Sequence, residues 1–261
     1  MSDVVRLEYR NVTMRFAATG NRGVLTAVQG VSFSVRDGEV VSLIGPSGCG
    51  KSTILKLISG LSPISAGRIV VDGVGPSGAL EKLAFVFQEP TLLPWLTVSR
   101  NVELPLRLHG TGGAERSEVA RKSLALVGLA DRADYYPRQL SGGQKMRVSI
   151  ARALSVSPRI LLLDEPFGAL DEMTRDHLNE ELLGIRQQLA WTAFFVTHSV
   201  AEAVFLSNRI LVMSANPGRV HTELRVDLPY PRTEDTRQSP AYQRLVAEGS
   251  KLLRSVERLK P

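Results

Sequence analysis

A glycine-rich stretch early in the chain has the composition and spacing of a loop that binds nucleotide phosphates. It runs Gly45, Pro46, Ser47, Gly48, Cys49, Gly50, Lys51, Ser52, Thr53 and fits the pattern G-x-x-x-x-G-K-[ST]. Glycines let the backbone turn its N–H groups inward, and the start of the following helix adds partial positive charge. In this pattern the Lys51 ammonium reaches the β- and γ-phosphates and the Ser52 hydroxyl ligates Mg²⁺. The stretch therefore predicts a nucleoside-triphosphate site.

Two adjacent carboxylates follow a short, fully apolar run later in the chain. Residues 160–163 are predicted to form a buried strand that ends in Asp164 and Glu165. Asp164 suits the coordination shell of Mg²⁺, whereas Glu165 can polarise a water for attack on the γ-phosphate. Because such a pair is difficult to explain by packing, it indicates hydrolysis of the bound nucleotide.

Two further polar residues stand where predicted strands end. Gln88 follows the apolar run 83–87, and His198 follows 192–197. Open α/β sheets bind ligands at the carboxyl ends of their strands. Gln88 is therefore a candidate for holding Mg²⁺ or the attacking water, and His198 for reaching the γ-phosphate. Each alone would be assigned as a structural strand end, but together with Glu165 they indicate a catalytic constellation.

A second anion-binding pattern lies in the middle of the chain. Ser141, Gly142, Gly143 and Gln144 directly precede a predicted helix over 145–154 that has a basic face. Free backbone N–H groups, a hydroxyl and the helix dipole can together hold a phosphate. The structural alternative is that Ser141 is only an N-cap with flexible glycines after it. Two phosphate-type sites in one chain disfavour that alternative.

The elements that must position these residues alternate between strands and helices. Residues 4–44 are predicted to form strands, with Asp37-Gly38 as a hairpin turn and a loop at 17–23. Tyr9 is assigned to the core of this layer, whereas Phe16 suits either the core or stacking on a nucleotide base. Residues 91–156 change to helical character.

Other elements follow from periodicity and from turn residues. Prolines 94 and 105 are expected to mark loops, and a helix is expected over 117–127. A helix after Asp171 carries the apolar stripe Leu178, Leu182, Ile185 and Leu189. A C-terminal helix over 239–259 is expected to pack on its own domain rather than at an interface.

Composition sets limits on the class of protein. The 261 residues are 43% hydrophobic and 22% charged, which suits one α/β domain with an inserted subdomain. The single cysteine, Cys49, excludes a disulfide framework and is better explained as a small loop residue than as a redox switch. No apolar run approaches the roughly 18 residues of a membrane span. The four histidines are scattered and form no metal-ligand cluster, and the net charge of +6 is modest.

Taken in order, these motifs resemble those of an ABC transporter ATP-binding subunit, from about residue 4 to residue 220. The resemblance rests on the phosphate loop, Gln88, Leu140–Gln144, Ile160–Glu165, Asp171 and His198. It implies an α/β fold: a P-loop NTPase core with an N-terminal antiparallel β layer and an inserted α-helical subdomain. The implied ATPase domain covers residues 1–230, with the helical subdomain at about 91–156. Residues 231–261 form a C-terminal extension that is expected to be helical.

The resemblance also implies cofactors, roles and a partner subunit. The cofactors are ATP and Mg²⁺, and Leu140–Gln144 corresponds to the family signature. In the implied head-to-tail dimer of ATPase subunits, identical or different, Ser141, Gly142, Gly143 and Gln144 of one subunit contact ATP on the other. Asp171 would communicate across that interface. His198 matches the switch histidine, Phe16 the adenine-stacking aromatic, and Ser52, Gln88 and Asp164 the groups around the metal ion.

A finer resemblance is to the importers of nitrate, sulfonates and taurine. It rests on Phe87–Val98, Asn101-Val102, Pro166–Asp171 and Ser214–Val220. The segment after Gln88 would then dock on a transmembrane permease subunit through Leu92, Leu93, Trp95 and Leu96, unless these side chains fill the helical core. The implied function is ATP hydrolysis that drives import of such a solute at the cytoplasmic face of the inner membrane. An extracytoplasmic solute-binding protein would be an indirect partner.

The chain departs from the family pattern at two positions. Ser199 follows His198 where the family usually has Asp, which leaves the local hydrogen bonding open. Met146 stands where Gln is common, and this substitution would weaken the ATP-bound interface.

Other functions fit the sequence less well. A soluble ABC ATPase acting on nucleic acid or ribosomes would carry a long coiled coil or two ATPase domains, whereas this chain has one phosphate loop and no sustained heptads. A non-catalytic nucleotide-binding module is disfavoured by the intact Lys51, Asp164, Glu165 and His198. An importer for a different small solute remains an alternative, and no direct contact with nucleic acid is expected.

Overall fold

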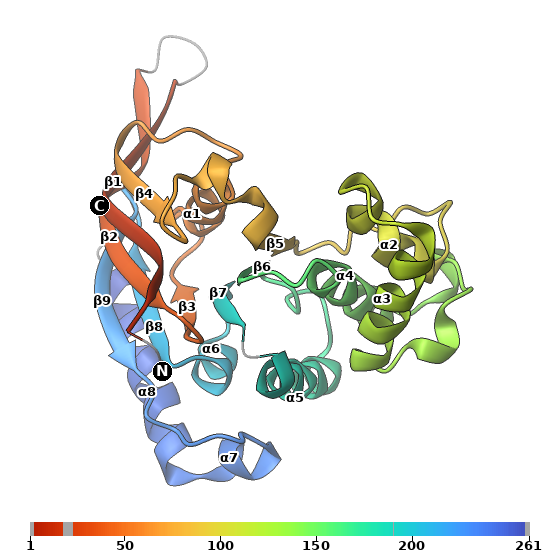
Figure 1. The fold of residues 1–261 in the computed structure, drawn as a ribbon. Coiled ribbons are helices and arrows are strands. Elements are labelled where there is room, and N and C mark those ends of the chain that lie inside the picture. The colour runs from red at the N-terminus through yellow and green to blue at the C-terminus, as the bar shows by residue number, and fades with distance from the viewer. Residues whose placement is uncertain (1–2, 18–22, 190, 259–261) are drawn as a thin grey trace. The chain divides into compact units, whose positions relative to one another are not determined.

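The computed structural model describes residues 3–17, 23–189 and 191–258, which separate into two compact units. The first unit comprises the described residues up to Leu80 and those from Trp191 onward, and the second comprises those from Glu81 to Leu189. The elements of the first unit are β1 (Val5–Ala17), β2 (Val24–Arg36), β3 (Val40–Ile44), α1 (Lys51–Ile58), β4 (Ala66–Val71), β7 (Thr192–Val196), α6 (Val200–Leu206), β8 (Arg209–Ser214), β9 (Arg219–Arg225), α7 (Glu234–Gln238) and α8 (Pro240–Glu257) (Figure 1). Those of the second are β5 (Leu83–Val86), α2 (Val98–Leu108), α3 (Gly113–Leu126), α4 (Gly142–Leu154), β6 (Ile160–Asp164) and α5 (Glu172–Leu189).

The first unit joins two layers of strands through a stack of aromatic rings. One layer is the antiparallel sheet β2-β1-β4, and the other has β3 between the parallel strands β7 and β8, with β9 antiparallel to β8. The Tyr9 ring stacks on Phe33 with centroids 4.5 Å apart, and Phe33 stacks on Phe194 at 5.2 Å. The Tyr9 hydroxyl donates to the carbonyl of Ile54 in α1 at 2.7 Å. Tyr9 is therefore a core residue, as its sequence context predicted.

The prediction of a hairpin at Asp37-Gly38 is wrong. β2 pairs with β1, whereas β3 pairs with β7 and β8, so this turn passes the chain from one layer to the other. The physical reason is burial: all five residues of β3 are buried, which suits the interior of a parallel sheet. The hairpin instead joins β1 to β2, and residues 18–22 of the expected loop lie outside the described residues.

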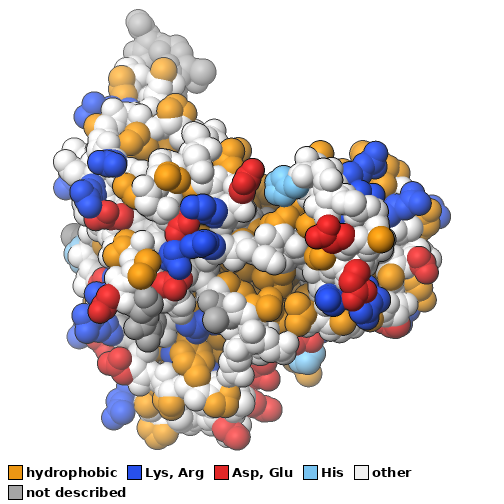
Figure 2. Space-filling view, viewed as in Figure 1, with side chains coloured by type: hydrophobic (Ala, Val, Ile, Leu, Met, Phe, Trp, Pro, Cys, Tyr) orange, Lys and Arg blue, Asp and Glu red, His pale blue; other side chains and the backbone are white. Residues whose placement is uncertain are grey.

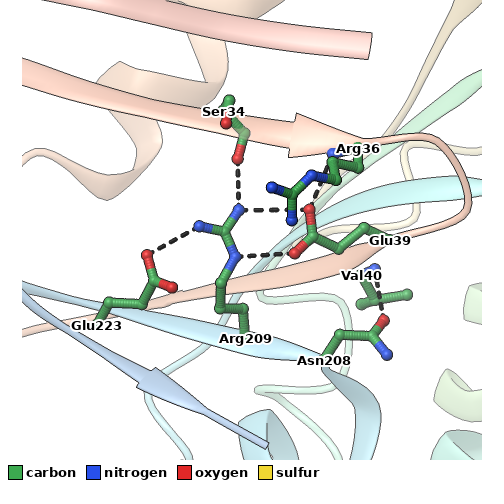
Figure 3. Close-up of polar contacts among 7 residues, drawn as sticks. All are labelled: Ser34, Arg36, Glu39, Val40, Asn208, Arg209 and Glu223. Atoms are coloured by element: carbon green, nitrogen blue, oxygen red, sulfur yellow. Dashed lines mark hydrogen bonds and ion pairs between the residues drawn. The ribbon is translucent and has the colours of Figure 1, made fainter. Parts of the chain in front are cut away.

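An ion-pair network holds the start of β3 in the first unit (Figure 3). From β8, the Arg209 guanidinium donates to Glu39 at 2.8 Å, to Glu223 at 2.8 Å and to the carbonyl of Ser34. Glu39 also accepts from the backbone N–H of Arg36 at 2.8 Å. The Glu39 side chain is only 5% exposed and that of Arg209 only 16%. Because β3 leads directly into the phosphate loop, this network fixes the position from which the loop starts.

The second unit combines a parallel strand pair with packed helices. β5 and β6 are in register from Leu83 opposite Ile160 to Val86 opposite Leu163. The helices α2, α3 and α4 pack against one another, and Arg147 of α4 forms a 2.9 Å ion pair with Glu181 of α5. No helix in the described part of the chain is apolar over a sufficient length to span a membrane.

Two expectations for the second unit are wrong. Pro105 lies inside α2 rather than in a loop. A proline within a helix costs about 3 kcal/mol, but burial of Val98, Val102 and Leu106 on one face of α2 offsets this cost. Leu189 is the last residue of α5 and is 46% exposed, so it does not belong to the buried stripe.

The C-terminal helix packs on its own unit, as expected. The Tyr242 hydroxyl of α8 donates to the carbonyl of Ala201 in α6 at 3.0 Å. A Cβ on Gly249 would lie only 2.7 Å from Val200 Cγ1, so the two helices touch at a glycine. The helix ends at Glu257, and residue 259 of the predicted range is outside the described residues.

The Arg209 network gives a stability prediction. Replacing Arg209 by Met leaves the Glu39 carboxylate buried without its cation, so the free energy of unfolding should fall by about 3–5 kcal/mol. Urea denaturation followed by circular dichroism measures this. Glu223→Gln is the control, because that side chain is 35% exposed and its loss should cost at most about 1 kcal/mol. Equal effects of the two variants would contradict the structural role of the network.

Candidate functional site

The phosphate loop is built by backbone conformations that favour glycine. Gly48 has φ 79° and Gly50 has φ 95°, both in the left-handed region. Lys51 begins α1 and is buried, and its ammonium donates to the carbonyls of Gly45 at 2.9 Å and Pro46 at 3.2 Å. The first residue of the helix therefore places a positive charge inside the loop.

The remaining loop side chains differ in exposure. Ser47 and Ser52 are exposed, and Ser52 lies in the first turn of α1, where its hydroxyl can meet a ligand. Cys49 is completely buried, and this burial raises the pKa of its thiol. A thiol with a raised pKa is a poor nucleophile. Cys49 therefore behaves as a small loop residue.

Other backbone segments approach the loop more closely than a side chain would allow. A Cβ on Gly50 would lie 2.5 Å from Val28 Cγ1 of β2. A Cβ on Gly218 would lie 2.1 Å from the carbonyl oxygen of Cys49. Gly218 also donates its N–H to the carbonyl of Ala27 at 3.0 Å. The turn before β9 thus supports the loop, a role that the sequence reasoning missed although the turn itself was visible.

His198 and the phosphate loop both follow the carboxyl ends of neighbouring parallel strands. β3 and β7 are parallel neighbours with Leu43 opposite Val196, and the N–H of Thr197 donates to the carbonyl of Leu43 at 3.3 Å. The chain therefore turns into Gly45 and into His198 at adjacent strand ends. The His198 side chain is exposed.

Ser199, which stands where the family usually has Asp, takes part in local hydrogen bonds on both sides of the start of α6. Its hydroxyl accepts the N–H of Glu202 at 3.2 Å and so caps α6. Its own N–H donates to the Thr197 hydroxyl oxygen at 3.0 Å, and the Thr197 hydroxyl donates to the buried Glu202 carboxylate. His198 is therefore held between two residues that this short network fixes.

Phe16 lies on the hairpin of the antiparallel sheet. It is opposite Leu25 in the pairing of β1 with β2, and its side chain is 41% exposed. Stacking of Phe16 on adenine stays a prediction.

In the second unit, the acidic pair and Gln88 lie at one edge of the β5–β6 pair. Asp164 ends β6, and Glu165 adopts φ 47°, which is unusual for a residue with a side chain. The N–H of Gly168 closes the turn on the carbonyl of Glu165 at 3.1 Å. Gln88 Nε2 lies 3.9 Å from the position that a Cβ on Gly168 would take. The strained backbone at Glu165 is the kind of feature that gathers at functional sites.

The donor chemistry of the predicted metal ligands fits Mg²⁺. Ser52, Gln88 and Asp164 offer hydroxyl, amide and carboxylate oxygens, and Mg²⁺ prefers oxygen ligands supplied by one or two carboxylates together with substrate phosphates. Among the described residues no group of three or more His, Cys, Asp or Glu side chains could form a dedicated metal site. A magnesium ion that arrives with nucleotide is consistent with both observations.

The second anion-binding pattern starts α4 as a capping box. The Ser141 hydroxyl accepts the N–H of Gln144 at 3.2 Å, and the Gln144 side-chain oxygen accepts the N–H of Ser141 at 3.0 Å. Ser141 is therefore an N-cap. This role leaves its anion-binding role possible, because a hydroxyl that accepts one bond keeps a proton to donate. Ser141 and Gly142 are exposed.

The signature residues pack beside Asp171 within the second unit. Cβ atoms on Gly143 and Gly142 would lie 3.0 Å from Thr174 and 3.5 Å from Leu170, respectively. Asp171 accepts the N–H of Thr174 at 2.9 Å, and this backbone hydrogen bond lowers the pKa of the Asp171 carboxyl.

Met146 lies in the core of the second unit, and a weakened ATP-bound interface stays a prediction for this substitution. The Met146 side chain is 2% exposed within that unit, so it does not reach a surface. The signature helix therefore presents its N-terminal residues, rather than Met146, to a ligand or partner.

Asn101 holds the segment that follows Gln88. It is fully buried, and its amide donates to the carbonyls of Leu93, Leu96 and Thr97 at 3.1, 3.1 and 3.0 Å. Its side-chain oxygen accepts the N–H of Leu93 at 2.8 Å. The segment is thus ordered although it has no regular secondary structure, and it carries Trp95 at 70% exposure.

Arg152 ties the same segment to α4. Its guanidinium donates to the carbonyls of Pro90 at 2.9 Å and Thr91 at 3.0 Å and to the Thr91 hydroxyl at 3.1 Å. Thr91 has φ 46°, so the bonds hold a strained turn. The sequence marked Asn101 only as part of a resemblance and gave Arg152 no role beyond a basic helix face, because only the fold brings these side chains to the carbonyls.

Comparisons with known proteins show which family the chain resembles. A family model described as ABC transporter matches residues 28–168. The nitrate import ATP-binding protein of Synechocystis is 42% identical over 244 residues, which cover 91% of this chain and 92% of that protein. An aliphatic sulfonates import ATP-binding protein of Bacillus cereus is 44% identical over 214 residues, which cover 82% and 84%.

A similar solved structure is a dimeric ATP-binding cassette in a post-hydrolysis state, bound to ADP and phosphate. Its TM-score is 0.75 and its identity 33%, over 85% of this chain and all of that one. Part of an ABC transporter complex from Clostridium perfringens aligns over 96% of this chain and 99% of its own, with TM-score 0.78 and 25% identity.

The contact behind the loop gives a prediction about nucleotide binding. Gly218→Ala forces the turn or the loop to shift, because the new Cβ would overlap the Cys49 carbonyl. A displacement of about 1 Å can cost on the order of a hundredfold, so the Kd for ATP should rise at least about tenfold. Isothermal titration calorimetry measures it. Gly75→Ala is the matched control, since a Cβ there meets nothing within 4 Å. Unchanged ATP affinity in Gly218→Ala would refute the supporting role of this turn.

Proposed function

Since the chain belongs to the ABC transporter family and hydrolyses ATP, we propose that it energises the import of a small anion or organic solute such as nitrate, a sulfonate or taurine. The observation that carries the proposal is a complete phosphate loop together with a capped signature helix in one chain. Identity to import subunits for nitrate and for aliphatic sulfonates supports the choice of solute.

ATP binding is assigned to the phosphate loop. The backbone N–H groups of Gly48, Gly50 and their neighbours face the phosphates, and the Lys51 ammonium moves from the Gly45 and Pro46 carbonyls onto the β- and γ-phosphates. Phe16 stacks on the adenine. When Mg²⁺ is bound, it neutralises charge on the phosphate oxygens, and Ser52, Gln88 and Asp164 are the residues that would hold it.

Hydrolysis is assigned to Glu165, His198 and Gln88. Glu165 accepts a hydrogen bond from the attacking water and takes its proton as the water oxygen bonds to the γ-phosphorus. The bond from that phosphorus to the bridging oxygen breaks at the same time, so that ADP leaves with the electron pair and phosphate is formed. His198 donates a hydrogen bond to the γ-phosphate, and Gln88 orients the water. Positioning and charge stabilisation supply most of the catalysis in this type of reaction.

We assign the second half of each ATP site to the signature of another ATPase subunit. At the N-terminus of α4, Ser141 and Gly142 are exposed, Gln144 is half-buried and Gly143 is buried. We assign Ser141, Gly142, Gly143 and Gln144 to ATP held on a partner subunit, and the exposed Asp171 to the same interface. The dimeric cassette bound to ADP and phosphate supports this arrangement. ATP binding then closes the dimer, and hydrolysis reopens it.

Coupling to transport is assigned to the segment held by Asn101 and Arg152. Trp95 is an exposed large hydrophobic side chain of this segment, and Leu92, Leu93 and Leu96 are half-buried in it. We assign this ordered apolar segment to the contact with transmembrane permease subunits at the cytoplasmic face of the membrane. An extracytoplasmic solute-binding protein would deliver the solute to those permeases.

An ATPase that acts on nucleic acid is the second candidate. A protein of this kind gathers Lys and Arg into a basic patch. On the face shown in Figure 2, basic and acidic side chains are interspersed in each unit. This face therefore gives no support to a nucleic-acid site.

The catalytic assignment is tested by Glu165→Gln. The amide cannot accept the proton of the attacking water, so the ATPase rate should fall by about a hundredfold or more while ATP binding persists. Because hydrolysis no longer reopens the dimer, Mg-ATP should convert the variant to a dimer in light scattering. Glu172→Gln, an exposed substitution in the same unit, is the control and should keep the wild-type rate. Equal rates for Glu165→Gln and wild type would exclude Glu165 as the base.

The docking assignment is tested by Trp95→Glu. A carboxylate at the centre of an apolar contact should abolish co-purification with co-expressed permease subunits, because burying an unpaired charge is costly. ATP binding should be unchanged. Leu108→Glu is a matched control, since Leu108 is 78% exposed in the same unit but lies outside the segment. Retained co-purification of Trp95→Glu would rule out this contact.

A further inference from the structure

The helix that follows His198 is too short to satisfy its own backbone. α6 has seven residues, and it begins immediately after its cap, Ser199. The last four carbonyls of any α-helix have no partner within the helix. The N–H of the C-cap Ser207 already binds Ala203, so the four carbonyls are those of Val204, Phe205, Leu206 and the C-cap itself. The first unit supplies their partners from the chain beyond β9.

Arg232 binds the C-terminal end of α6. It is 3% exposed, and one nitrogen of its guanidinium donates to the carbonyls of Val204, Phe205 and Ser207 at 3.0, 2.9 and 2.8 Å. The guanidinium also lies 4.2 Å from the centre of the Tyr230 ring, which holds it in place. One buried cation thus satisfies most of the helix end and complements its negative dipole.

Two tyrosines from the same region bind other carbonyls of α6. The Tyr230 hydroxyl donates to Leu206 at 3.2 Å, and the Tyr242 hydroxyl of α8 donates to Ala201 at 3.0 Å. Side chains of residues 230–242 therefore bind carbonyls along α6 from its first turn to its C-cap. Because these hydrogen bonds go to the backbone of α6, they fix the direction and the position of that helix.

The N-terminal end of α6 in turn fixes His198. Glu202, in the first turn of the helix, is buried and accepts from Thr197, and Ser199 caps the helix. His198 lies between Thr197 and Ser199, so a shift of α6 along its axis moves the His198 backbone. Arg232 is thus connected to the backbone around His198 through α6 and a series of hydrogen bonds that all lie within the first unit.

We propose that Arg232 and Tyr242 are positioning residues that brace α6 from the C-terminal extension and thereby set the placement of His198 for hydrolysis. The inference rests on the proposed function, in which His198 donates to the γ-phosphate. It gives the extension over residues 231–261 a role in the rate of hydrolysis without contact with nucleotide. A purely structural attachment would instead change ATP binding, folding and rate together.

The proposal is tested with Tyr242→Phe, which removes one hydroxyl and keeps the buried ring, and with Arg232→Gln. In both variants kcat for ATP should fall on the order of tenfold, because small misplacements of a catalytic group are costly. The Kd for Mg-ATP, measured by calorimetry, should stay within about twofold, since the phosphate loop is untouched. Arg244→Gln, an exposed substitution on α8, is the control and should retain the wild-type kcat.

A second readout separates positioning from general stability. In a His198→Gln background, where the group to be positioned is absent, Tyr242→Phe should lower the rate no further. Additive losses in the double variant would overturn the proposal, as would an unchanged kcat in Tyr242→Phe or a parallel loss of ATP binding. If the wild-type chain itself hydrolysed no ATP, the proposed function would fail instead, and the two failures are therefore distinguishable.

Discussion

The nucleotide site depends on backbones that approach more closely than any side chain permits. Gly50 lies against Val28 of β2, and Gly218 lies against the carbonyl of Cys49, so the phosphate loop is enclosed between an antiparallel sheet and the turn before β9. This explains why the first unit needs both of its strand layers. The aromatic stack from Tyr9 through Phe33 to Phe194 joins the two layers.

Helix N-termini are the second recurring device. The phosphate loop, Ser141, Asp171 and Ser199 each stand at the start of a helix, where backbone N–H groups are free to bind an oxygen. In three of these starts a side-chain oxygen caps the helix. The cap fixes the backbone of the residues that the sequence marks as functional. Capping and ligand binding are therefore compatible uses of one local geometry rather than competing explanations.

Arginines bound to carbonyls are the third device. Arg152 holds Pro90 and Thr91, Arg175 donates to Phe167 and Leu170, and Arg232 binds the end of α6. Each guanidinium binds carbonyls of a turn or a helix end, so irregular backbone next to a site becomes rigid. The five donors of a guanidinium make it better suited to this task than lysine.

The sequence by itself determined the chemistry and the strand ends that carry it. The phosphate loop, the acidic pair after a buried strand and the capped start of α4 are local patterns, so residues 45–53, 160–165 and 141–144 could be identified without a fold. The tertiary structure decided what depends on contacts between distant residues. It placed Asp37-Gly38 between two layers, kept Pro105 inside a helix, buried Met146, and brought Gly218 and Arg232 to backbones far away in sequence. The physical reason is that a hydrogen bond or a steric contact between remote segments leaves no periodic trace in the sequence of either.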